Sequence, residues 1–102
     1  MDNLTGFQRD LLYVIAGFDR PSGASIRSEI GKYYQSEINH GRLYPNLDTL
    51  VADGLVEKGE IDRRTNSYIL TDAGDTAIRE RREWEIQYLS ADVRESPDPQ
   101  PC

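Results

Sequence analysis

The segment from Asn39 to Gly54 constrains the fold most, because it reads as one amphipathic helix with both ends marked. Four apolar side chains recur at the spacing of a single helical face: Leu43, Leu47, Leu50 and Val51. Asn39 is a good N-cap, and glycine is the residue type that most often ends a helix in the left-handed conformation. Pro45 falls within the first two turns, where it removes at most one backbone hydrogen bond. We therefore predict a helix with one face on a core and the other face open.

The elements around this helix are predicted from the same kinds of signal. Thr5 caps a first helix, and Ser22 or Gly23 opens a second one. Residues 55–61 and 67–70 read as strands joined by a polar turn at 62–66, which makes them a β-hairpin. Thr71 caps a last helix that runs to about Val93. The expected fold class is α+β and mainly α, with three helices, a two-stranded wing and a C-terminal helix, in the order of a winged helix-turn-helix domain.

Length and composition set the domain organisation. A chain of 102 residues is one domain by size. We assign residues 4–71 to the winged helix, 72–93 to a C-terminal dimerisation helix and 94–102 to a disordered tail, since the tail holds three prolines and little that could be buried. The sequence lacks a signal peptide and a long apolar run, so we expect a cytoplasmic protein that does not enter a membrane. The one cysteine, Cys102, is interpreted as an incidental thiol.

Two sequence motifs carry a resemblance to a known family. Residues 41–50, GRLYPNLDTL, followed by DGLV at 53–56, resemble the third-helix signature of the PadR-like transcriptional regulators, Gly-x-Leu-Tyr-x-x-Leu-x-x-Leu and then Gly-Leu-Ile/Val. Residues 68–74, YILTDAG, are similar to the family's Tyr-x-Leu-Thr-x-x-Gly after the wing. The acidic composition, with ten Arg and two Lys, resembles that of haloarchaeal members. Two departures are a C-terminal region shorter than is usual in the family and a wing sequence, residues 62–64, that also resembles MarR-like regulators.

This element order directs the third helix into the major groove of double-stranded DNA. On its open face, Arg42 is the candidate for a guanine and Asn46 for an adenine, while Thr49 could contact a thymine methyl or a phosphate. At the start and flank of the helix, Asn39, His40 and Tyr44 are candidates for contacts near the phosphate backbone.

Further candidate contacts lie outside the third helix. The wing offers four polar residues at its turn: Arg63, Arg64, Thr65 and Asn66. Arg27 and Lys32 on the second helix are candidates for the DNA backbone. A polar hairpin turn and a solvated helix face are the alternative interpretations of these residues.

The last helix carries more apolar surface than a small domain can bury. Its apolar residues recur at helical spacings: Ala77, Ile78, Trp84, Tyr88 and Leu89. Packing against the same helix of a second copy would cover them, so we predict a homodimer. Two third helices would then meet successive major grooves ~34 Å apart on a pseudo-palindromic site.

The sequence offers no catalytic constellation, so an enzyme is not expected, and no cofactor or metal is expected beyond bound salt ions. The net charge of −6 is unusual for a DNA-binding domain, which is generally basic. The prediction is therefore a DNA-binding regulator, more readily a repressor than an activator, with two alternatives left open. One is a MarR-like regulator that responds to a ligand, and the other is a winged helix that binds a protein.

Overall fold

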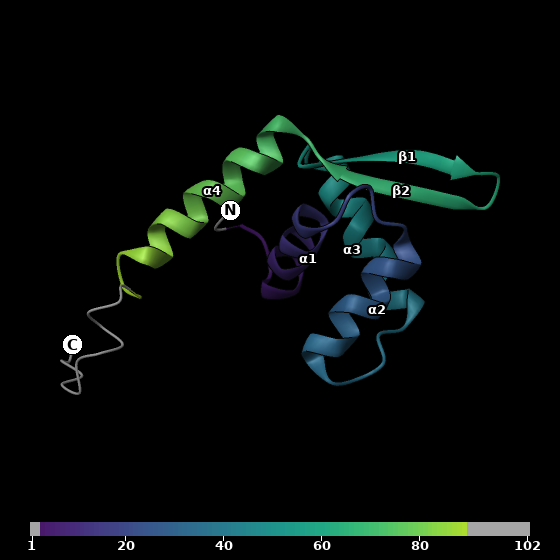
Figure 1. Ribbon diagram of the computed structural model, residues 1–102, viewed down its shortest axis with the longest axis horizontal. Coiled ribbons are helices and arrows are strands. Elements are labelled where there is room, and N and C mark those ends of the chain that lie inside the picture. The colour runs from purple at the N-terminus through teal and green to yellow at the C-terminus, as the bar shows by residue number, and fades with distance from the viewer. Residues whose placement is uncertain (1–2, 90–102) are drawn as a thin grey trace.

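The computed structural model describes residues 3–89 and has the predicted mainly helical α+β architecture (Figure 1). The elements follow in this order: α1 (Gly6–Gly17), α2 (Gly23–Tyr34), α3 (His40–Ala52), β1 (Val56–Asp62), β2 (Thr65–Leu70) and α4 (Asp72–Ile86). The two strands pair antiparallel and form a hairpin. None of the described helices is both long and apolar enough to span a membrane. The assignment of residues 94–102 to a tail lies outside the described part.

Each helix begins at a side-chain cap of the predicted kind. Thr5, Ser22, Asn39 and Thr71 have extended backbone, and the side-chain oxygen of each accepts a hydrogen bond from a backbone N–H three residues on. α3 ends at Ala52, and Gly54 takes the left-handed conformation with φ of 78°. These caps set the first residue of every helix.

Two boundaries differ from those predicted. β2 begins at Thr65, two residues before the predicted start, so that Thr65 and Asn66 pair with β1 and the turn is tighter. The Asp62 carboxylate accepts a hydrogen bond from the Arg64 backbone N–H at 2.9 Å, which closes this turn. α4 ends at Ile86 with Gln87 as its C-cap, whereas the prediction ran to about Val93; residues 90–93 of that range lie outside the described part.

The core lies where α1, α2 and α3 meet beneath the start of the hairpin. Its largest fully buried side chains come from every one of these elements: Leu11, Leu12, Ile15, Ile26, Ile30, Leu43, Leu47, Leu50, Val56 and Tyr68. α4 contributes Ile78 to the same cluster, where it is 9% exposed. Beyond this residue α4 extends to the side opposite the hairpin (Figure 1), and its last turn lies beside Tyr13 of α1.

The hairpin is fixed to the loop that precedes α2. The Tyr68 backbone N–H donates to the carbonyl of Pro21 at 3.0 Å, and Ser22 forms a bridge with Ser67. Ser67 is itself buried. The base of the wing, the start of α2 and the side of α3 are therefore held as one unit.

Candidate nucleic-acid interface

A groove of about 270 Å³ lies between the first turn of α2, one side of α3 and the hairpin. It is lined by Ser22, Gly23, Ala24, His40, Tyr44, Arg64, Thr65, Asn66 and Tyr68. Five of these residues are candidates for DNA binding from the sequence, and they come from two elements far apart along the chain. The fold therefore brings half of the third-helix and wing candidates to one concave surface.

Tyr44 crosses this groove from α3 to the first turn of α2. A Cβ atom at Gly23 would lie only 2.6 Å from the Tyr44 hydroxyl oxygen, so the glycine is what allows this approach. The His40 ring lies beside Tyr44, with the ring centroids 5.0 Å apart. The two side chains thus point into the groove together, at the flank of α3.

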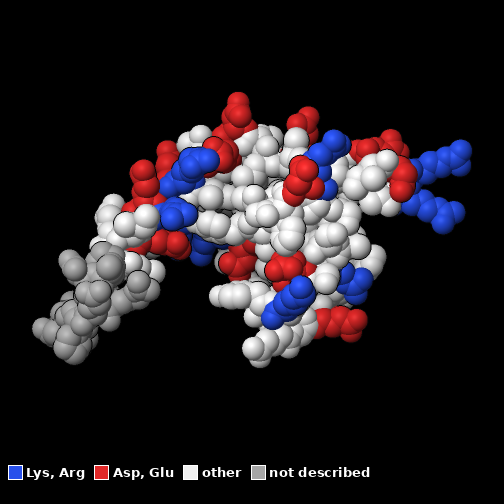
Figure 2. Space-filling model, viewed as in Figure 1, with Lys and Arg blue, Asp and Glu red and all other residues white. Residues whose placement is uncertain are grey.

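The wing tip carries the two arginines farthest from the body of the domain. Arg63 and Arg64 form the turn between β1 and β2, and both are exposed. In Figure 2 blue side chains extend from the hairpin tip beyond the rest of the surface. Red and blue groups alternate along α4, whereas the hairpin tip presents two adjacent arginines with acidic groups just behind them.

Arg42 lies on the opposite flank of α3, against α1 and α2. Its guanidinium carbon is 4.0 Å from the centroid of the Phe7 ring and 5.4 Å from that of Tyr34. Such stacking fixes an arginine without neutralising it. Arg42 remains exposed, so it is held in place with its charge available at the edge of α3.

Asn46 and Thr49 are engaged within the protein. The Gln8 side-chain amide donates to Asn46 Oδ1 at 2.8 Å, and Asn46 Nδ2 donates to the carbonyl of Arg42 at 2.6 Å. The Thr49 hydroxyl donates to the carbonyl of Pro45 at 3.1 Å. Each of these bonds uses one of the two acceptor sites on Oδ1 or one of the two hydrogens on Nδ2, so a bidentate interaction with adenine would have to share both atoms with Gln8 and Arg42.

Gln8 is a contributor that sequence reasoning missed. It closes a capping box with Thr5 at the start of α1, where each side chain bonds the other residue's backbone N–H. Its side-chain amide also reaches α3 through Asn46. The Thr-x-x-Gln spacing is visible in the sequence as a cap, but the link to α3, 38 residues away, is not.

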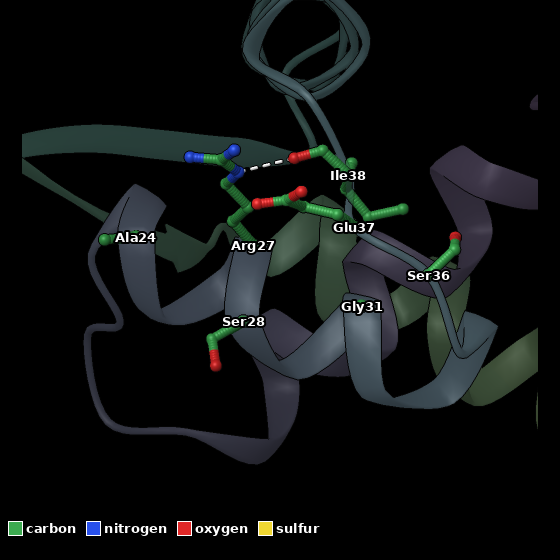
Figure 3. A pocket seen from close by; sticks show the side chains of 7 residues that line it. All are labelled: Ala24, Arg27, Ser28, Gly31, Ser36, Glu37 and Ile38. Carbon is green, nitrogen blue, oxygen red and sulfur yellow. Dashed lines mark hydrogen bonds between the residues drawn. The ribbon is translucent and has the colours of Figure 1, made fainter.

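The two candidates on α2 have different surroundings. Arg27 Nε donates to the carbonyl of Ile38, as the dashed line in Figure 3 shows. Arg27 lines a hollow of about 400 Å³ with residues of the α2–α3 turn, including Glu37. Lys32 pairs with Glu29 on its own helix at 3.4 Å. Neither residue lines the groove between α3 and the wing.

The predicted dimer residues separate into two groups. Ile78 belongs to the core of the domain. Trp84, Tyr88 and Leu89 are exposed, and the Trp84 and Tyr88 rings lie 5.2 Å apart. A further hollow of about 310 Å³ between α1 and α4 adds Tyr13 and Ile86, which sequence reasoning did not include. Ala77 is half-buried.

Three tyrosines have perturbed acidity. Burial raises the pKa of Tyr68, with Tyr44 and Asp48 adding to the effect. Burial also raises the pKa of Tyr34, whose hydroxyl donates to Asp10 at 2.7 Å, and that of Tyr13, which faces Glu85. All three are therefore neutral hydrogen-bond donors near pH 7.

Within residues 3–89 no cluster of three His, Cys, Asp or Glu side chains could hold a metal ion.

Comparison with known proteins shows which family the chain belongs to. Residues 11–80 match the model of the transcriptional regulator PadR-like family. A structure of RosR from H. salinarum, from crystals grown in NaBr, is 48% identical, with a TM-score of 0.84 over 91% of this chain and 86% of RosR. No significant match is found among curated protein sequences.

More distant structures share the fold. F93 from STIV, described as a winged-helix DNA-binding protein, is 28% identical, with a TM-score of 0.63 over 83% of this chain and 91% of F93. Streptococcus pneumoniae FabT, solved in complex with DNA, is 16% identical, with a TM-score of 0.74 over 94% of this chain and 64% of FabT.

Proposed function

Since the chain belongs to the PadR-like family and is a DNA-binding transcriptional regulator of the haloarchaeal type, we propose that it represses transcription. In this proposal it acts as a homodimer on a pseudo-palindromic operator. Repression would follow from occlusion of a promoter by the bound dimer. The observation that carries the proposal is the groove where α3, the first turn of α2 and the wing present polar side chains together.

In this proposal α3 enters the major groove and the wing follows the neighbouring backbone. Arg42 is the candidate for base contact, since stacking on Phe7 holds its guanidinium at the edge of the helix. Arg63 and Arg64 contact phosphates from the wing tip. Asn39, the cap of α3, and Asn46 hold the helix in place, and Thr49 presents its methyl group while its hydroxyl bonds Pro45. Arg27 and Lys32 are assigned a weaker, peripheral role at the DNA backbone.

The homodimer is proposed from the apolar side of α4. Trp84, Ile86, Tyr88 and Leu89 are all about half exposed or more. Ile86 and Leu89 line a hollow with Tyr13 of α1, and Trp84 and Tyr88 lie side by side on α4 and the residues just after it. Large exposed apolar patches mark interaction sites on small proteins. We assign residues 4–71 to DNA binding and residues 72–93 to pairing.

We further propose that the protein acts in the cytoplasm and has no catalytic role. The acidity supports one rival, a winged helix that binds a protein through α3, because it opposes binding to DNA at low salt. A ligand-responsive regulator of MarR-like type would instead release DNA when an effector is bound.

The test is a mobility-shift titration in molar KCl with duplexes from the promoter of its own gene and of neighbouring genes. We expect a saturable complex with at least one promoter that an unrelated duplex does not displace, and sedimentation of the free protein as a dimer. Absence of any specific complex, together with a stable protein partner from pull-down, would overturn the regulator assignment.

A further inference from the structure

We infer that the groove between α3 and the wing is a seat for one DNA backbone phosphate, with the Tyr68 hydroxyl as its innermost donor. The inference deepens the proposed function and rests on it. It concerns a residue on β2 that the sequence placed only in a strand and in the family motif.

Tyr68 carries an unused hydrogen-bond donor at the floor of the groove. The residue is 1% exposed, yet it lines the groove beside Tyr44. Among residues 3–89 its hydroxyl has no hydrogen-bond partner, while no fully buried side-chain polar atom there lacks one. The hydroxyl therefore reaches the groove surface. The ring of Tyr68 is thus buried while its hydroxyl can donate into the groove, so an acceptor on a bound ligand can take the place of water there.

The surrounding groups are also donors. The groove also holds Tyr44, whose hydroxyl Gly23 admits against the start of α2. In that first turn the backbone N–H groups of Gly23 and Ala24 have no acceptor within the helix. Ser22 accepts hydrogen bonds only from the next two N–H groups, those of Ser25 and Ile26. The positive end of the α2 dipole thus faces the same space. Arg64 lines the outer side of the groove.

This set of groups suits a phosphate better than a base edge. A phosphate presents only acceptor oxygens, and the groove offers hydroxyl, amide and guanidinium donors. Base edges mix donors and acceptors, and they are read from the open face of α3 instead of its flank. Asp48, a carboxylate that raises the pKa of Tyr68, is paired with Lys58 at 3.9 Å, which lowers its repulsion of an anion.

The experiment compares Tyr68→Phe with the wild type on the promoter duplex and on an unrelated duplex. The substitution removes one oxygen and keeps the buried ring. We expect affinity for both duplexes to fall by the same factor, about three- to tenfold, as for loss of one neutral hydrogen bond. The slope of affinity against salt should stay unchanged, because a hydroxyl releases no counterion. Gly23→Ala, which displaces the Tyr44 hydroxyl, should weaken binding in the same uniform way.

The matched control is Tyr33→Phe, which removes a hydroxyl from a side chain 76% exposed on α2 and outside the groove. Thermal unfolding of each variant separates weaker binding from loss of the fold. Duplexes carrying a single uncharged methylphosphonate then locate the phosphate. One position should weaken the wild type but have no further effect on Tyr68→Phe.

The outcomes separate this inference from the proposed function. If the wild type binds its promoter and Tyr68→Phe binds equally well, only the phosphate seat is wrong. The same holds if the loss is confined to duplexes with one particular base pair, which would make Tyr68 a base reader. If the wild type forms no complex with any duplex, the regulator assignment fails and this inference fails with it.

Discussion

Gln8 joins two helices through one buried side chain. It is 9% exposed, accepts the Thr5 N–H at 3.1 Å and donates to Asn46 Oδ1 at 2.8 Å. We expect Gln8→Ala to lower the free energy of unfolding by about 1–2 kcal/mol, because a capping interaction and an interhelical hydrogen bond are removed. Urea unfolding followed by circular dichroism would measure this.

Gln8→Glu separates the two roles of this residue. A carboxylate can still accept the Thr5 N–H, but it cannot donate to Asn46, so the link to α3 is broken and the cap is kept. We expect Gln8→Glu to be less stable than the wild type and to bind DNA more weakly. The matched control is Gln87→Glu, which makes the same change at an exposed residue. Equal stability of Gln8→Glu and the wild type would show that the clasp between α1 and α3 contributes nothing.

Local residue roles were predictable from the sequence, and those that depend on distant partners were not. The caps at Thr5, Ser22 and Asn39 follow from neighbours three residues away. The engagement of Asn46 depends on Gln8, and the position of Tyr44 depends on Gly23, so neither follows from helical periodicity. Rotation about α3 predicts which residues face outward, but it does not predict which of them another element already holds.

The wing acts as an element through its charge. Arg63→Ala and Arg64→Ala should each weaken binding to all duplexes alike, because interactions with phosphates carry no sequence information. For each phosphate that the variant no longer neutralises, the slope of log affinity against log salt should become less negative by about 0.9. Fluorescence anisotropy over a salt series would measure both effects. Arg79→Ala is the control, since Arg79 is exposed on α4 and pairs with Asp75.

A change in specificity with either wing variant would contradict this assignment and place the wing at base edges. The hairpin itself was predicted, but its tighter turn moves Thr65 and Asn66 from the tip into β2. The turn is tighter because the Asp62 carboxylate accepts a hydrogen bond from the Arg64 backbone N–H. A run of polar residues in the sequence does not show how many of them belong to the turn.

α4 is the element whose function depends on a second copy. Trp84 is 49% exposed and packs on Tyr88 and Arg81, so its removal costs the monomer little. We expect Trp84→Ala to weaken the dimer by about 2 kcal/mol or more, as for a central aromatic interface residue. Sedimentation at micromolar concentration should then show monomer where the wild type is dimeric. Tyr33→Ala, at an exposed aromatic on α2, should leave the dimer intact, and an unchanged dimer in Trp84→Ala would move the interface elsewhere.

At the scale of the whole molecule, the net charge of −6 is spread over elements that also carry arginines. Arginines mark the wing tip and the edge of α3, while acids occupy exposed positions on several elements, including Asp48 on α3 itself. Basic DNA-binding proteins lose affinity as salt rises, because binding releases counterions from DNA. In the proposed complex, acids near the DNA would take up cations on binding, which opposes that release. The net charge therefore bears on the response to salt and does not exclude DNA binding.

We therefore expect affinity for the promoter duplex to stay level or to increase as KCl is raised from about 0.1 M toward the molar range, where the Debye length falls from ~10 Å to ~3 Å. Asp48→Asn provides the sharpest comparison, because its carboxylate is 66% exposed on α3 and pairs with Lys58 across 3.9 Å. Removing this charge should raise affinity most at low salt and make the slope more negative. Glu83→Gln, on the exposed part of α4, should leave the slope unchanged. A steep loss of wild-type affinity across the whole series would show that cation uptake near α3 plays no part.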